Sequence, residues 1–273
     1  MVTTVADQQP IVASSARRLR FHRILVSEWI KLWSLRSTYW LVLGTIVAMV
    51  MIAVVLGAMS VTGMEGGGPG GRAALEMGYS FAQLTVAVLG VLIITGEYTT
   101  GTIRPTFAAV PTRLPVLLAK ATLVGGMSFV LGILGVGVAY AISSPLFDQA
   151  TAADLSDPAV WRIFWGTGLY LAAVAMFGLA IGAVIRNTAG AVTAVLGTPF
   201  ILSTVWQLLM TDTNWFTTTY PYLPFVAGEQ IILPAATADE MQLLAPWSGF
   251  GVFMIYIVVA YLAAAVLLRR KDA

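Results

Sequence analysis

The sequence predicts an all-α, polytopic membrane protein with six transmembrane helices, and three observations support this fold class. Charged residues make up 10% of the 273 residues, whereas a soluble domain carries roughly 25%. Hydrophobic residues make up 58%, which leaves too little polar surface to cover a soluble globule. The apolar residues also gather in stretches close to the roughly 20 residues that a helix needs to cross a bilayer. A soluble enzyme and a disordered chain are therefore excluded.

Six stretches are apolar and long enough to span a membrane, and together they form a predicted transmembrane domain over residues 41–268. The second stretch is the shortest, so its limits are the least defined. Glycines in the third and fourth stretches form small faces that let helices approach closely: Gly132, Gly135 and Gly137 in the third, Gly178 and Gly182 in the fourth. The predicted spans are Leu41–Met59, Tyr79–Ile94, Ala121–Ile142, Ile163–Ile185, Ala189–Met210 and Trp247–Leu268.

The distribution of Lys and Arg predicts the orientation of these spans. Thirteen of the 15 basic residues fall on the side that holds both termini, and only Arg72 and Arg162 fall on the other. Because basic loops stay in the cytoplasm, both termini are expected there, in a protein of the plasma membrane. A cleavable signal peptide is the competing interpretation of the start. The basic region of about forty residues is too long for one, which favours a retained first helix.

Three segments flank the spans. Residues 1–16 are polar and small, which is typical of a disordered cytoplasmic tail. Polar and apolar residues alternate over residues 17–40 with the period of a basic amphipathic helix. Trp29 falls on its apolar half, and Glu28 and Lys31 fall on its polar half. We expect this helix to lie in the cytoplasmic headgroup layer, the alternative being a simple basic anchor that fixes orientation. Residues 269–273 form a short basic cytoplasmic tail.

Two loops stand out. The cytoplasmic loop after the second span carries charges of both signs, and Pro105 and Pro111 limit any helix in it to one or two turns. Such a short, charged element suits a docking surface, although any cytoplasmic loop carries basic residues for orientation. The outer loop over residues 211–246 has no Lys or Arg and many aromatic residues. We expect it to lie on the membrane or to fold partly back into it, sheltered by protein.

Several kinds of chemistry are absent from the sequence. There is no Cys and a single His, and neither a P-loop nor a nucleophile or metal-binding motif occurs. The chain is therefore not expected to be an enzyme, to hold a metal or cofactor, or to bind nucleic acid. The predicted hydrocarbon cores contain no charged residue, which argues against ion coupling within this chain. Their polar residues either line a substrate path or form interhelical hydrogen bonds: Gln83, Thr85, Thr193, Ser203, Thr204 and Gln207.

These features together resemble the membrane subunits of ABC exporters of the ABC-2 type. The basic amphipathic helix matches over residues 27–37. The loop after the second span is similar to the family pattern at Glu97, Gly101-Thr102, Pro111-Thr112-Arg113 and Lys120. The last outer loop has a similar Leu223-Pro224-Phe225 element, and the C-terminus, Arg269 to Ala273, is also similar.

The resemblance implies a permease that forms a homodimer and binds two copies of a separate ATP-binding cassette subunit, which holds the ATP and Mg. It would export a hydrophobic or amphipathic substrate, such as a drug, peptide, antibiotic or lipid, from a bacterial cell. Glu97 would order a short coupling helix or pair with Arg104 or Arg113. The alternatives are an uncoupled channel or facilitator and an immunity-type membrane protein. The residues implied in coupling to the ATPase are Glu28, Lys31, Arg36, Glu97, Gly101, Thr102, Arg104 and Arg113.

Overall fold

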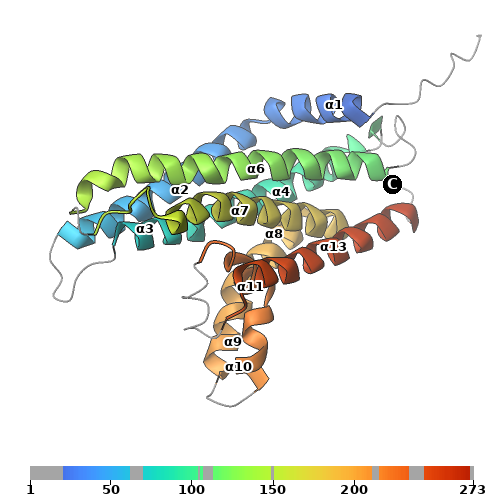
Figure 1. Ribbon diagram of the computed structural model, residues 1–273. Helices are drawn as coiled ribbons and strands as arrows, with labels where there is room; N and C mark the ends of the chain where they lie inside the picture. Colours follow the sequence, from blue (N-terminus) through green and yellow to red (C-terminus); the bar gives the residue numbers. More distant parts are fainter. Residues whose placement is uncertain are drawn as a thin grey trace, which may run out of the picture.

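The computed structural model describes residues 21–61, 70–103, 105–106, 113–148, 151–210, 215–233 and 243–270, with side chains through residue 268. Every regular element within these ranges is a helix, and the long helices form one bundle (Figure 1). The predicted N-terminal tail over residues 1–16 lies outside the described residues. The same holds for the end of the basic C-terminal tail, residues 271–273.

The six predicted spans are confirmed, because six helical segments are long and apolar enough to cross a membrane. Each predicted stretch lies within one of them, apart from Met210, which follows the end of the fifth. The second span is longer than predicted, because a short helix precedes it directly. The spans are α2 (Arg36–Val61), α3 with α4 (Gly71–Met77 and Tyr79–Thr100), α6 with η1 (Leu114–Ser143 and Ser144–Leu146), α7 (Pro158–Ile185), α8 to α9 (Thr188–Gly197 and Ser203–Leu209, joined by η2, Thr198–Leu202), and α13 (Pro246–Arg270).

Helix α7 is the centre of the bundle and packs against α4, α6 and α13 (Figure 1). Glycines allow the backbones of α4 and α7 to approach each other directly. A Cβ atom on Gly90 would lie 2.0 Å from the Ala175 carbonyl oxygen, and one on Gly178 would lie 2.5 Å from the Ala87 carbonyl oxygen. Close approach through small residues replaces the hydrophobic driving force that lipid cannot supply between helices.

Two more of the predicted glycine contacts are present. A Cβ on Gly132 of α6 would meet the Gly168 Cα of α7 at 2.7 Å, and one on Gly182 would meet the Ile94 side chain at the same distance. The glycine faces predicted on the third and fourth spans therefore do bring helices together.

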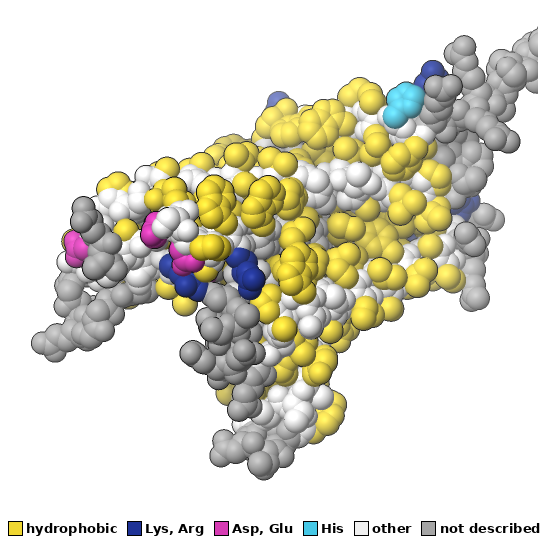
Figure 2. Space-filling view, in the orientation of Figure 1, with side chains coloured by type: hydrophobic (Ala, Val, Ile, Leu, Met, Phe, Trp, Pro, Cys, Tyr) yellow, Lys and Arg dark blue, Asp and Glu magenta, His cyan; other side chains and the backbone are white. Residues whose placement is uncertain are grey.

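One end of the bundle carries most of the basic side chains in the described residues, and we call it the basic end. It is the end at which the C-terminus lies (Figure 1). Hydrophobic side chains cover much of the face that runs along the helices (Figure 2). The basic residues at this end are Arg23, Lys31, Arg36, Arg113, Lys120 and Arg186.

Helix α1 (Phe21–Ser34) covers the middle of the predicted amphipathic helix over residues 17–40, of which residues 17–20 lie outside the described residues. Leu35 separates it from α2, so the first span begins at Arg36 rather than at Leu41. Thr38 secures this junction, because its hydroxyl donates to the Leu32 carbonyl at 2.7 Å. The face of α1 that packs on the bundle combines polar and apolar residues, because its buried residues are Ile24, Glu28 and Leu32. Trp29 and Ile30 are exposed.

In the part that the structure describes, the outer loop folds back into the bundle, which is the second of the two arrangements that the sequence left open. It contains α10 (Trp215–Thr219), η3 (Tyr220–Tyr222) and α11 (Pro224–Glu229). Helix α11 packs between α7 and α13, and its residues from Pro224 to Gly228 are buried. Glycines again allow the approach, because a Cβ on Gly166 of α7 would lie 2.6 Å from the Ile231 carbonyl oxygen. The non-helical backbone after α11 is thus enclosed by protein, as a lipid environment requires.

The fifth span differs from the other five because it leans away from the bundle in Figure 1. Its middle is a π-helical turn that contains Pro199, and proline cannot donate the backbone hydrogen bond that a regular α-helix needs. Helix α9 buries none of its residues, and Leu208 is 79% exposed. This apolar surface is suited to lipid or to another membrane protein, and not to water.

Candidate functional site

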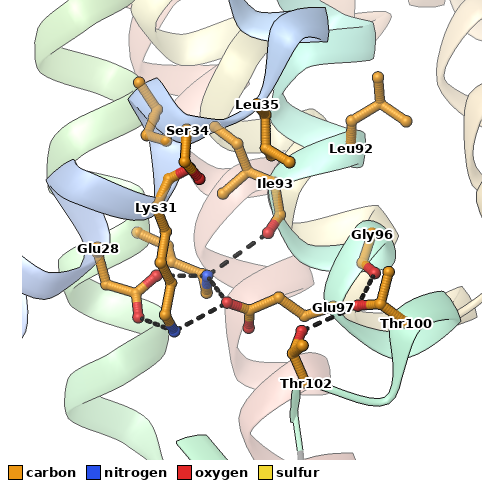
Figure 3. Close-up of a pocket in the computed structure, with 12 residues that line it drawn as sticks. Glu28, Lys31, Ser34, Leu35, Leu92, Ile93, Gly96, Glu97, Thr100 and Thr102 are labelled. Atoms are coloured by element: carbon orange, nitrogen blue, oxygen red, sulfur yellow. Dashed lines mark hydrogen bonds and ion pairs between the residues drawn. The ribbon is translucent and has the colours of Figure 1, made fainter.

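Four charged side chains from three helices meet at the basic end (Figure 3). Lys31 of α1 contacts Glu28 at 2.7 Å and Glu97 of α4 at 3.0 Å. Lys120 of α6 contacts the same two carboxylates, with the Glu97 oxygen at 2.9 Å. Each lysine therefore bridges both glutamates, and we call the four residues the charge network.

The network is balanced in charge, and three of its four side chains are almost closed to solvent. The side chains of Glu28, Glu97 and Lys120 are 3%, 11% and 2% exposed, whereas that of Lys31 is 41% exposed. Each ammonium group has three acceptors within 3.5 Å: Lys31 has Thr106 as its third and Lys120 has the Ile93 carbonyl. One carboxylate oxygen, Glu97 Oε2, is buried without a hydrogen-bond partner among the described residues.

Local sequence explains how each helix presents its charges. Glu28 and Lys31 are three residues apart, so they lie on one face of α1. Glu97 is in the last turn of α4, which ends at Gly101 with φ of 73°, a conformation that glycine adopts without strain. Lys120 lies in the second turn of α6, which starts just after Arg113. The two helix ends thus bring the two charges to the same level.

Because the network is largely buried, each of its charges depends on the opposite charges beside it. Burial alone would lower the pKa of Lys31, but its hydrogen bonds and the charges of Glu28 and Glu97 raise that pKa above its ordinary value. Lys31 therefore stays charged at neutral pH. Two buried carboxylates and two ammonium groups offset each other's desolvation only while all four are present.

A groove of about 340 Å³ opens beside the network, between α1 and α4 (Figure 3). The charge network forms one side, and Leu32, Leu35 and Leu92 contribute an apolar surface. Thr100 and Thr102 border it at the end of α4, where their hydroxyl oxygens are 2.9 Å apart. The groove is an amphipathic recess at the point where α1 meets the loop that follows α4.

Comparison with known proteins assigns the whole chain. A family model described as "ABC-2 family transporter protein" matches residues 8–273. The chain belongs to the ABC-2 transporter family. The comparison with curated proteins gives no match. The match and the six spans make the protein a multi-pass membrane component of a transporter, and the charge network lies on two of the segments by which the sequence resembled ABC-2 permeases.

The structure brings together three of the eight residues that the ABC-2 resemblance implied in coupling. Glu28, Lys31 and Glu97 form the charge network, whereas Arg36 is exposed at the start of α2. Gly101 ends α4 and Thr102 borders the groove. Arg104 lies outside the described residues.

The described partners of Glu97 are lysines, whereas the resemblance implied Arg104, which lies outside the described residues, or Arg113. Glu97 pairs with Lys31 and Lys120, while Arg113 donates to the Leu268 carbonyl at 2.7 Å. Arg186 similarly donates to the Leu267 carbonyl at 3.0 Å. Carbonyls in the last turn of a helix have no partner within the helix, so these two arginines fasten the end of α13 to α6 and α7.

Lys120 is the site residue of this ABC-2 protein that the sequence reasoning missed. It was counted for orientation and as part of the family pattern, but not as a site residue. A signal was available, because Lys120 is surrounded in sequence by apolar residues from Leu114 to Val124. A lysine within such a run must find a partner if it is buried.

The predicted path residues separate into two groups. Gln83 accepts a hydrogen bond from Tyr170 of α7, and Thr85 is 2.7 Å from the Thr45 hydroxyl of α2. Both therefore join helices within the bundle, which favours the interhelical alternative. The others belong to the fifth span, where Thr193, Thr204 and Gln207 are exposed and Ser203 is half-buried.

Proposed function

We propose that this protein is the permease subunit of an ATP-driven exporter in the bacterial plasma membrane. It moves a hydrophobic or amphipathic substrate, and a separate ATP-binding cassette subunit hydrolyses ATP with Mg. Two permease copies assemble with two copies of that subunit. The basic end faces the cytoplasm, where the ATPase binds.

The charge network is the observation that carries this proposal, together with the family match. It ties α1, α4 and α6 to one another at the end where the loop after α4 leaves the bundle. A force applied to that loop is transmitted to three helices at once, because moving Glu97 displaces both lysines. A pure anchor for orientation would need basic residues, but not two buried carboxylates between them.

The exposed fifth span supports the second permease copy. Leu208 and Ile201 are 79% and 66% exposed, and Gln207, Thr204 and Thr193 lie on the same span. Two copies that meet along this span would enclose polar groups between them. This arrangement gives a weakly polar path for an amphiphile without a charged residue in either fifth span.

The decisive experiment is reconstitution in bilayer nanodiscs with the ATP-binding subunit that a neighbouring gene encodes. We expect a stable complex whose ATPase activity differs from that of the ATPase alone. A folded ATPase that neither copurifies with this chain nor changes its activity would contradict the proposal and favour the channel or immunity alternatives.

Glu97→Gln tests the coupling role of the network. We expect the transport-coupled ATPase rate of the assembled complex to fall about fivefold or more, which is the usual lower range of coupling between sites. The reason is that a neutral amide cannot hold Lys31 and Lys120 together. The measurement is the ATPase rate with and without substrate.

Glu76→Gln is the matched control, because Glu76 pairs with Arg72 at 2.9 Å at the opposite end of the bundle. It removes the same charge from an ion pair far from the ATPase. Both variants are checked for copurification first. If the transport-coupled ATPase rates of the two variants were equal, the charge network would have no role in coupling.

A further inference from the structure

The outer loop carries a carboxylate into the bundle. Glu229 ends α11, and its Oε2 accepts a hydrogen bond from the Tyr79 hydroxyl at 2.8 Å. Tyr79 is eight residues from Gly71, where the second span starts, so it lies about 12 Å along the helices from that end. Glu229 belongs to the predicted outer loop over residues 211–246. The structure places it among the spans.

No positive charge accompanies this carboxylate. In the described part of the chain Glu229 forms no ion pair, and no Lys, Arg or His contributes to its electrostatic surroundings. The titratable groups that face it are three tyrosines: Tyr79 on α4, Tyr170 on α7 and Tyr220 in η3. Helix α13 contributes an aromatic ring beside Glu229, because Phe253 contacts Gly228 and its ring is tilted against that of Tyr170.

The surroundings of Glu229 suit a cation with an apolar body. The rings of Tyr79 and Tyr170 meet edge to face at 5.2 Å, and Phe253 follows at 6.2 Å from Tyr170. Aromatic faces attract ammonium groups, most strongly where water is excluded. Glu229 lies deep among these elements but is half-buried rather than fully enclosed.

We propose that Glu229, with the tyrosines around it, binds the positively charged group of an organic cation, which exchanges with a proton. A carboxylate without a counter-ion in an apolar site is stabilised by either. The binding site needs only this chain. That the cation is a transported substrate rests on the exporter function proposed above.

The pKa of Glu229 defines the pH range in which a proton competes with the cation. Burial raises the pKa of Glu229 from its ordinary value of 4.5 to about 7, with the Tyr79 hydrogen bond opposing the increase. The carboxyl is therefore mostly neutral at pH 6 and mostly ionised at pH 8. Because only the ionised form attracts a cation, apparent affinity should rise about tenfold over this interval.

The test is equilibrium binding of radiolabelled tetraphenylphosphonium to the protein in zwitterionic nanodiscs, without any ATPase. This probe is permanently charged, so a dependence on pH belongs to the protein, and empty nanodiscs correct for partition into lipid. We expect binding about tenfold tighter at pH 8 than at pH 6. Glu229→Gln should bind at pH 8 at least about tenfold more weakly than the unmodified chain and show no pH dependence, while Glu76→Gln should retain both.

Tyr79→Phe provides a second variant if Glu229→Gln does not fold. It removes the hydrogen bond that favours the ionised form, so the midpoint of the pH dependence should move upward. Binding that is independent of pH, or a Tyr79→Phe midpoint that is unchanged or lower, would overturn the proposal, as would unchanged binding by Glu229→Gln. Normal binding without any ATPase association would instead refute the exporter function and leave this site standing.

Discussion

Gly90→Ala should prevent the protein from accumulating in a folded form. The new Cβ would lie 2.0 Å from the Ala175 carbonyl oxygen and 3.0 Å from the Leu179 backbone nitrogen. These are backbone atoms of α7, the central helix, so no side chain can turn aside to make room. Relief requires α4 and α7 to separate along their whole contact. We expect a loss of about 3 kcal/mol or more in stability, measured as monodisperse yield and melting temperature in detergent.

Gly96→Ala is the matched control because it lies on the same helix, and an added Cβ there meets nothing within 4 Å. In a helix, alanine is favoured over glycine by about 1 kcal/mol. The control should therefore equal or exceed the unmodified protein in melting temperature. If both variants behaved alike, the close α4–α7 approach would be wrong.

Lipid explains why the spans could be predicted and the orientation of α1 on the bundle could not. A bilayer requires long apolar runs, so the runs appear in the sequence whatever they pack against. A helical wheel separates Trp29 from Glu28, but it does not say which side faces protein. Here the partner surface offers Lys120 to Glu28, and Ile24 and Leu32 are buried on the same helix, so the inner side combines polar and apolar residues.

The surroundings of Glu229 and Lys120 could not be predicted from the sequence, for the same reason. Charge counting placed Lys120 on the cytoplasmic side, and Glu229 belongs to the predicted outer loop, so each lies outside the predicted apolar stretches. The outer loop was expected to fold back, but its sequence does not say which of its residues become enclosed, and α6 begins at Leu114, before the predicted span. Each side chain is enclosed by elements distant in sequence: Glu229 by Tyr79 and Tyr170, and Lys120 by Glu28 and Glu97. No local pattern records such long-range contacts.

Lys120→Met should be among the most destabilising single changes at the basic end. It leaves Glu28 and Glu97 to share Lys31, so one buried negative charge has no counterpart. Removing one partner of a buried ion pair costs about 3–5 kcal/mol. Glu28→Gln should cost a similar amount for the opposite reason, because one buried ammonium then lacks its carboxylate. Both are measured as stability of the folded protein in the same nanodiscs or detergent.

The double variant Glu28→Gln with Lys120→Met separates coupling from simple loss of contacts. It removes one charge of each sign, and the remaining Lys31–Glu97 pair at 3.0 Å is neutral overall. We therefore expect it to be more stable than the sum of the single changes by about 2 kcal/mol or more. The same cycle on Arg72 and Glu76, which are more exposed, should give under about 1 kcal/mol. Strict additivity for Glu28 and Lys120 would mean that the four charges do not act as one unit, and a pull on the loop after α4 would then reach α1 and α6 by some other contact.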